Sequence, residues 1–215
     1  MIPTNAQSAD APELAAVAAH ALNNVIAVLY AASSYLESAA NPRSLERATR
    51  ALGDACGSAL CLSAALSLLA LPPAGMLRVP AGGQELHPDD IARVLQTLEA
   101  ATNAKPSLHN AGAEPVKATI DRDTLQSLLL CAAAVLRRAA DRDAPLRCDV
   151  RRTAGRLEFE LCCEGPASAG SLRSSRDPCE LALAHAAAHL PVLAAQMDRS
   201  RPGSIRFCVE LADFA

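Results

Sequence analysis

The sequence of 215 residues has no tryptophan, and aromatic residues make up only 2% of it. It has no run of about 18 uninterrupted apolar residues, the length of a membrane-spanning helix. Its first ten residues also lack the positive charges that begin a secretion signal. The net charge is −3 and no basic run occurs, which disfavours a nucleic-acid partner. We therefore expect a cytoplasmic protein that binds neither membrane nor nucleic acid.

Motifs for metals and nucleotides are also scarce. None of the eight cysteines belongs to a C-x-x-C pair, which disfavours a zinc site, and most occupy apolar positions where a free thiol acts as a small hydrophobe. The adjacent Cys162-Cys163 pair leaves redox sensing open. His185 and His189 have the spacing of a two-histidine metal site, but only alanines lie between them. We predict no metal and no cofactor in this chain.

Alanine and leucine dominate the hydrophobic 51% of the sequence, a composition that favours closely packed helices. The apolar spacing predicts two long helices, from about residue 11 to 38 and from 42 to about 71. Asn41-Pro42 provides an N-cap followed by proline at the first helical position, and the short link requires an antiparallel hairpin. Because each helix is apolar over a broad arc, we expect two hairpins to form a four-helix bundle in a homodimer.

The remaining chain alternates helices and strands, which predicts a two-layer α/β sandwich. The acidic pairs Asp89-Asp90 and Asp121/Asp123 are expected at helix starts, where the helix dipole favours negative charge. Pro191 is expected to kink the last helix. His87 and His109 are expected in solvated loops. The expected elements are a helix to about 102, a strand at 116–120, a helix at 123–139, strands at 146–152 and 156–163, a helix from 178 and a strand at 204–211. The predicted fold class is α+β, organised as a 1–10 tail, an 11–72 hairpin, a 73–86 linker and an 87–215 sandwich.

His20 is out of phase with the apolar stripe of the first helix. At about 100° per residue, His20 points ~140° away from the centre of that stripe, and Asn24 lies one turn further along the same outer face. Ala16, Ala27 and Ala31 flank the histidine. An exposed imidazole on a smooth face suits a phosphate carrier that another protein approaches closely. The stripe consists of Leu14, Ala18, Ala21, Leu22, Val25, Val28, Leu29, Ala32 and Leu36.

Four segments, in order, resemble the catalytic core of sensor histidine kinases. His20-Ala21-Leu22-Asn23-Asn24 is similar to the H-[DE]-x-N-N phospho-acceptor box, and residues 121–130 are similar to the D-x-x-L-x-Q-V-L-x-N entry to the nucleotide helix. Residues 157–165 resemble the strand that ends in D-x-G-x-G, and Gly203-Ser204-Ile205-Arg206-Phe207 resembles the closing G-[ST]-x-F. The resemblance implies the fold already expected from the element order.

The residues that differ from that pattern are those that the kinase family uses to bind ATP and to react with it. Cys131 and Val135 stand where the family has the asparagines that hold magnesium and phosphate, and neither offers the oxygen ligands that magnesium requires. Cys163 replaces the adenine-binding aspartate. Three further positions differ from the family. Ala167 replaces the second glycine of the D-x-G-x-G motif, and Cys179-Glu180-Leu181-Ala182 replaces the glycine-rich turn. Ala21 replaces the general base of autophosphorylation. The resemblance therefore implies that the chain does not bind ATP.

A retained histidine without nucleotide chemistry resembles the ChpT-type histidine phosphotransferases. The resemblance implies that His20 carries phosphoryl groups between receiver domains of response regulators, with a hybrid histidine kinase as a further partner and magnesium supplied by the receiver. Asn24 would orient the reacting group, and Ala16, Asn23, Ala27 and Ala31 would contact the receiver. Three alternatives stay open: a pseudokinase adaptor that only binds a kinase or response regulator, a phosphatase that uses Asn24, and a merely solvated Asn24.

Overall fold

A computed structural model of the 215-residue chain describes residues 11–37, 41–71, 84–109, 115–140, 144–153, 155–163, 177–190 and 203–211. Three features expected from the sequence lie outside these ranges: the 1–10 tail, most of the 73–86 linker, and the kink at Pro191. Ala167, which stands at a motif glycine of the kinase family, also lies outside them.

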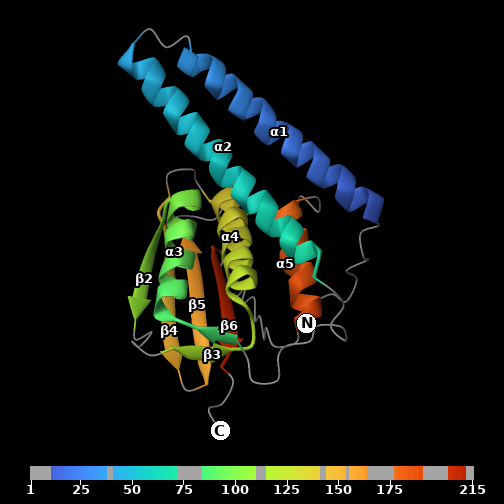
Figure 1. Ribbon diagram of the computed structural model, residues 1–215, viewed down its shortest axis with the longest axis vertical. Helices are drawn as coiled ribbons and strands as arrows, with labels where there is room; N and C mark the ends of the chain where they lie inside the picture. The colour runs from blue at the N-terminus through green and yellow to red at the C-terminus, as the bar shows by residue number, and fades with distance from the viewer. Residues whose placement is uncertain are drawn as a thin grey trace.

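The N-terminal part is the predicted antiparallel hairpin, formed by α1 (Ala11–Glu37) and α2 (Pro42–Leu69). Asn41 caps α2: its side-chain oxygen accepts a hydrogen bond from the backbone N–H of Ser44 at 2.9 Å, and Pro42 takes the first helical position. The end of the hairpin that joins the two helices lies away from the rest of the molecule (Figure 1).

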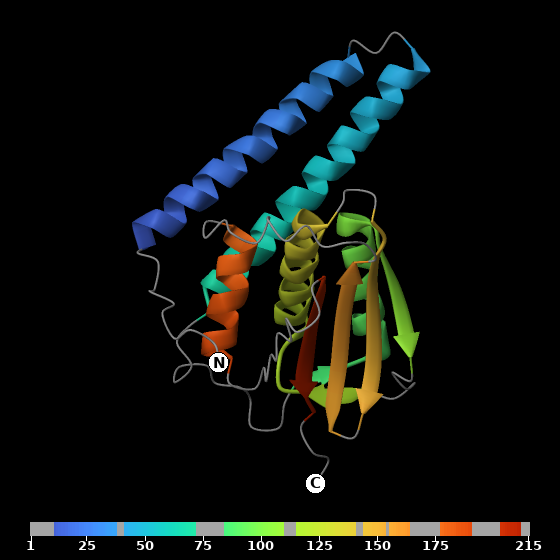
Figure 2. The same ribbon diagram turned by 180° about the vertical axis from the view of Figure 1, so that it is seen from behind.

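The C-terminal part is the predicted two-layer sandwich of helices on a sheet (Figure 2). Its main sheet has the order β2-β4-β5-β6, in which β2 pairs parallel to β4 and the other pairs are antiparallel. A two-stranded sheet joins β1 and β3. The elements are β1 (Gln84–Leu86), α3 (Pro88–Thr102), β2 (Ala104–His109), β3 (Val116–Ala118), α4 (Arg122–Ala139), β4 (Leu146–Thr153), β5 (Arg156–Cys163), α5 (Pro178–His189) and β6 (Ser204–Glu210). The α+β fold class is confirmed.

Two strands correct the sequence-based expectation. β1 lies inside the segment expected to be a linker, and β2 includes His109, which was expected in a loop. β1 has only three residues, and β2, although its apolar and polar residues alternate, contains Pro106, which cannot donate a backbone hydrogen bond. Both form because distant partners supply their hydrogen bonds: β1 pairs with β3, and β2 pairs with β4. Such long-range pairing leaves no local signal in the sequence.

The core lies between the main sheet and α3 and α4. Residues 127–136 of α4 are all buried, and the inward residues of β5 alternate with partly exposed ones. Phe159 on β5 is completely buried and is the largest such side chain in the described residues. This continuous apolar helix against an alternating sheet is the pattern expected when one face of a sheet is covered.

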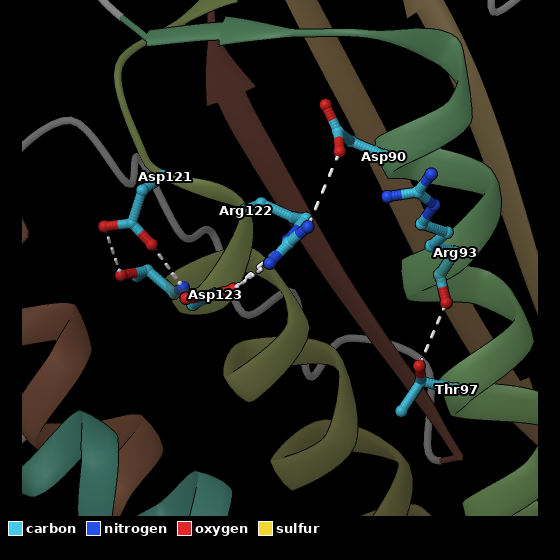
Figure 3. A network of polar contacts seen from close by, with 7 residues as sticks. Asp90, Arg93, Thr97, Asp121, Arg122 and Asp123 are labelled. Carbon is cyan, nitrogen blue, oxygen red and sulfur yellow. Dashed lines mark hydrogen bonds and ion pairs between the residues drawn. The ribbon is translucent and has the colours of Figure 1, made fainter.

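Acidic residues stabilise the starts of α3 and α4 (Figure 3). Asp121 caps α4 by accepting from the backbone N–H of Thr124 at 2.7 Å, as its position near a helix start predicts. Arg122 lies between Asp123, at 3.1 Å, and Asp90 in the first turn of α3, at 3.7 Å. These pairs are partly or largely exposed to solvent, so each contributes at most about 1 kcal/mol.

α2 belongs to both parts of the molecule. The elements that contact it are α1 on one side and α3, α4 and α5 on the other. Cys61, Ala64 and Leu68 in its C-terminal half are buried in the core of the sandwich. Gly57 allows the close approach of α3, because a Cβ at this position would overlap the carbonyl oxygen of Ala101. The hairpin is thus joined to the sandwich along half of one helix.

α1 keeps much of its apolar surface exposed. Within the stripe expected from the sequence, Val25 and Ala32 are buried against α2, whereas Leu22 and Val28 are not, because one neighbouring helix covers only part of a broad arc. Residues Val17–Glu37 and Pro42–Leu69 are long and apolar enough to cross a membrane by length and composition, a test that core helices of soluble proteins also pass. The expectation of no membrane contact stays a prediction.

Candidate functional site

His20 lies on the outer surface of α1 and its side chain is exposed. Asn24 follows one helical turn later, and its side-chain Nδ2 lies 3.3 Å from Nε2 of His20. When Nδ1 carries the imidazole proton, Nε2 has a free lone pair and accepts a hydrogen bond from this amide. The pair therefore presents a nucleophilic nitrogen to solvent with a hydrogen-bond donor beside it.

The predicted docking residues share this helix face. Asn23, Ala27 and Ala31 are all exposed, and a rotation of about 100° per residue puts them within roughly 60° of His20. Ala16 also lies on α1, but its side chain falls outside what the structure describes. The alanine side chains are short, so these described neighbours project little beyond the helix surface around the imidazole. Their contact with a receiver stays a prediction.

A second exposed face of the hairpin is apolar and is distinct from the His20 face. We call it the apolar face. On α1 it comprises Leu22, Ile26 and Tyr30, which are 50%, 52% and 79% exposed. On α2 it comprises Leu45, Leu60 and Leu66, also exposed. At ~100° per residue, the centre of the α1 set is about 120° from His20. A partner that covered the apolar face would leave the histidine accessible.

A cavity of about 500 Å³ lies between the hairpin and the first turn of α5. Asn24 and Val28 line it from α1, and Asp54 and Ser58 line it from α2. The full lining is Ala21, Asn24, Val25, Val28, Ala51, Asp54, Ala55, Ser58, Leu62, Arg138, Pro178 and Cys179. Asn24 is thus shared between the surface that carries His20 and the cavity.

The positions that correspond to nucleotide ligands in the kinase resemblance lie in an apolar interior. Cys131 and Val135 on α4 are buried in the core. Cys179 lies in the first turn of α5 and is also buried, where α5 contacts both α2 and α4. Cys163 at the end of β5 is half-buried, and burial raises the pKa of its thiol. These thiols and alkyl groups offer neither hard oxygen ligands nor a carboxylate.

Three thiols meet where α2, α4 and α5 come together; we call them the thiol cluster, comprising Cys61, Cys131 and Cys179. Cys61 Sγ lies 3.7 Å from the backbone oxygen of Leu130, and Cys179 Sγ lies 3.7 Å from the backbone oxygen of Cys61. The Cys131 and Cys179 thiols are hydrogen-bonded to each other. Among the described residues, no group of three or more metal-ligating side chains has the arrangement of a metal site.

The three thiols differ in acidity. The hydrogen bond with Cys131 and the nearby Arg138 guanidinium lower the pKa of Cys179, although its burial acts in the opposite direction. The hydrogen bond to Cys179 and burial raise the pKa of Cys131, and burial raises the pKa of Cys61 to about 12. The surroundings of Cys179 thus lower its pKa, whereas those of Cys61 and Cys131 raise theirs.

Sequence reasoning missed the cavity and the residues that complete it. Arg138 on α4 lines the cavity and forms an ion pair with Asp177, the N-cap of α5. Neither residue belongs to a recognisable motif, and their meeting depends on how α4 and α5 pack. The one available signal was Asp177-Pro178, an N-cap followed by proline at the first helical position.

No family model matches the sequence, and no curated protein matches it. Among solved structures, a bacterial phosphotransferase is similar, with 13% identity, a TM-score of 0.46, and coverage of 93% of this chain and 94% of that one. The Acinetobacter baumannii histidine kinase AdeS has 14% identity and a TM-score of 0.43, and a histidine kinase from Burkholderia phymatum STM815 has 13% identity and a TM-score of 0.40. Each covers 91% of this chain and 98% of the other.

Proposed function

We propose that this chain is a histidine phosphotransferase that relays phosphoryl groups between receiver domains in a two-component pathway, with His20 as the carrier. The observation that carries the proposal is the exposed His20–Asn24 pair, on a helix face separate from both the α2 contact and the apolar face. A carrier must be reached by donor and acceptor in turn, and each is a folded domain. An imidazole with small neighbours meets that requirement.

Transfer to His20 needs a nucleophile and a way to stabilise the moving phosphoryl group. Nε2 attacks the phosphorus of a receiver phosphoaspartate; the new N–P bond forms as the O–P bond to the carboxylate breaks, and the carboxylate leaves. The Asn24 amide, 3.3 Å from Nε2 in the resting chain, donates its hydrogen bond to a phosphoryl oxygen once Nε2 is occupied. The receiver domain would supply the magnesium ion that neutralises the remaining charge. The reverse reaction passes the group to a second receiver.

The chemistry of the family's nucleotide positions in this chain supports relay over autophosphorylation. Attack on ATP gains from a general base beside the histidine, and Ala21 stands at that position. Buried Cys131 and Val135 supply no oxygen ligand for magnesium. Transfer from a phosphoaspartate needs neither, because the receiver brings its own acidic pocket.

The exposed apolar face supports a homodimer through the hairpin. Leu22, Ile26 and Tyr30 on α1 and the three leucines on α2 present large apolar side chains to solvent. Large exposed apolar side chains gathered on one part of a protein are characteristic of interaction sites. A second hairpin against this face would complete a four-helix bundle and leave both copies of His20 outside.

The test is incubation of the full chain with phosphorylated receiver domains, followed by detection of acid-labile phosphate on the chain. We expect phosphate on the wild-type protein and none on His20→Ala, whose melting temperature and dimerisation stay unchanged because an exposed side chain contributes little to stability. His87→Ala, a change at another exposed histidine, serves as the control that retains transfer. If His20→Ala carries phosphate as well as the wild type does, the carrier role is wrong. Receiver binding without any phosphate on the chain would favour the adaptor.

A further inference from the structure

The cavity between the hairpin and α5 has a mostly apolar wall with a few polar side chains. Its volume of about 500 Å³ lies within the range of about 300–1,000 Å³ that small-molecule sites in proteins occupy. Its polar side chains include Asn24, Asp54, Ser58 and Arg138. The class of ligand that the cavity accepts therefore depends on which charges and hydrogen-bonding atoms of these side chains are still free.

The hydrogen-bond donors of Ser58 and Asn24 are already engaged. The Ser58 hydroxyl donates to the backbone oxygen of Asp54 at 2.9 Å. The Asn24 side-chain nitrogen lies 3.3 Å from Nε2 of His20, to which it donates. The lone pairs of the Ser58 hydroxyl and of Asn24 Oδ1 remain available, and these oxygens accept hydrogen bonds. The cavity wall thus offers acceptors to a ligand.

The charge that the cavity offers to a ligand belongs to Asp54. The Arg138 guanidinium forms an ion pair with Asp177, so its charge is already balanced. Arg50, one helical turn before Asp54, pairs instead with Glu46 at 3.0 Å. Within the described part of the chain, no cation pairs with the Asp54 carboxylate. A cleft with one unbalanced negative charge attracts positively charged ligands.

We propose that the cavity binds a small organic amine, with its ammonium group at Asp54 and its hydrocarbon body against the apolar wall. A protonated amine brings one positive charge and three hydrogen-bond donors. These match the Asp54 carboxylate and the acceptor oxygens of Ser58 and Asn24. Val28 and Leu62 are among the residues that would contact the hydrocarbon. The inference does not depend on the proposed relay, because it concerns binding alone.

Asn24 joins this site to His20 and provides a local readout of binding. Its Oδ1 would accept a hydrogen bond from the ammonium group, while its Nδ2 faces Nε2 of His20. Bound amine would therefore hold the amide in the orientation that donates to the imidazole. In a two-dimensional NMR titration of the full chain, we expect the side-chain amide resonances of Asn24 to shift as the amine is added.

The binding experiment is calorimetry of the full chain with straight-chain primary amines. We expect the affinity to rise about two- to fourfold for each methylene added between n-propylamine and n-hexylamine, because each methylene buries further apolar surface. Hexanoate, which carries a negative group on a chain of similar length, should not bind. The proposal is overturned if no amine binds at millimolar concentration, or if chain length has no effect, as expected for a loose surface counter-ion.

Asp54→Asn keeps the shape of the side chain and removes its charge. It should weaken n-hexylamine binding at least about tenfold, the usual cost of losing a hydrogen bond to a charged group. Because Asp54 is exposed, we expect the variant to fold, which circular dichroism checks. Glu99→Gln, at an exposed carboxylate on α3 outside the cavity, is the matched control and should bind as the wild type does. Equal affinity of Asp54→Asn and the wild type would refute the site.

Two further outcomes, both read from the wild-type chain, would overturn the proposal. If n-hexylamine shifts the Ile26 methyl resonances and leaves Asn24 unchanged, the amine binds the apolar face instead of the cavity. A lysine side chain of a partner protein is the other source of an ammonium group, and Nα-acetyl-lysine methylamide represents it. Tighter binding of this probe than of n-hexylamine would assign the cavity to a protein partner.

Discussion

Replacing Gly57 by alanine should destabilise the protein, although the same change usually stabilises a helix. Alanine is favoured over glycine in a helix interior by about 1 kcal/mol. At Gly57, however, the new Cβ would overlap the Ala101 carbonyl at the end of α3. That end cannot move aside freely, because the Arg137 guanidinium holds the carbonyls of Thr102 and Asn103 at 3.0 and 3.2 Å. Overpacking of this kind costs about 1–3 kcal/mol.

The expected net loss for Gly57→Ala is therefore up to about 2 kcal/mol of unfolding free energy, the overpacking cost less the gain in helix propensity. Gly53→Ala is the matched control on the same helix, because a Cβ there meets no atom within 4 Å. It should gain up to about 1 kcal/mol. Urea unfolding followed by far-UV circular dichroism measures both changes. If the two variants are stabilised alike, the close approach of α2 and α3 described here is incorrect.

Four further predictions concern the surface and the core. Ile26→Glu should convert the proposed homodimer into a monomer of 22.3 kDa by light scattering, because it puts a charge in the apolar face; an unchanged mass would contradict the proposed dimer interface. Ala27→Arg should block phosphoryl transfer from receivers while the mass stays dimeric, since the side chain would project beside His20; full transfer would show that receivers dock elsewhere. Calorimetry with magnesium and ATP should give no binding heat, and a tight complex would refute the loss of nucleotide binding. Phe159→Ala, at a completely buried site, should cost about 3–5 kcal/mol in urea unfolding; a smaller loss would show that the core collapses around the gap.

The sequence was informative where structure depends on local signals. Asn41-Pro42 predicted the start of α2, and the alternation at 156–163 predicted β5 with its bounds. The exposure of His20 followed from helical phase alone. In each case the relevant residues lie within a few positions of one another, so periodicity and capping preferences carry the information.

Features that depend on distant residues were missed or incomplete. β1 is only three residues long and β2 contains a proline, and the two strands form by pairing with β3 and β4. The thiol cluster brings together Cys61, Cys131 and Cys179 from three helices, and no spacing in the sequence relates them. The exposure of Leu22 was not foreseen, because helical phase shows which residues are apolar but not how many neighbouring helices cover them.

The shared helix α2 has a mechanical consequence. In a kinase that phosphorylates its own histidine, the nucleotide domain must travel to the acceptor. Here the C-terminal half of α2 is itself part of the core, through Cys61, Ala64 and Leu68, so such a swing would first require that core to open. The hairpin and the sandwich share one core through α2, so any rotation of one against the other must separate these packed side chains.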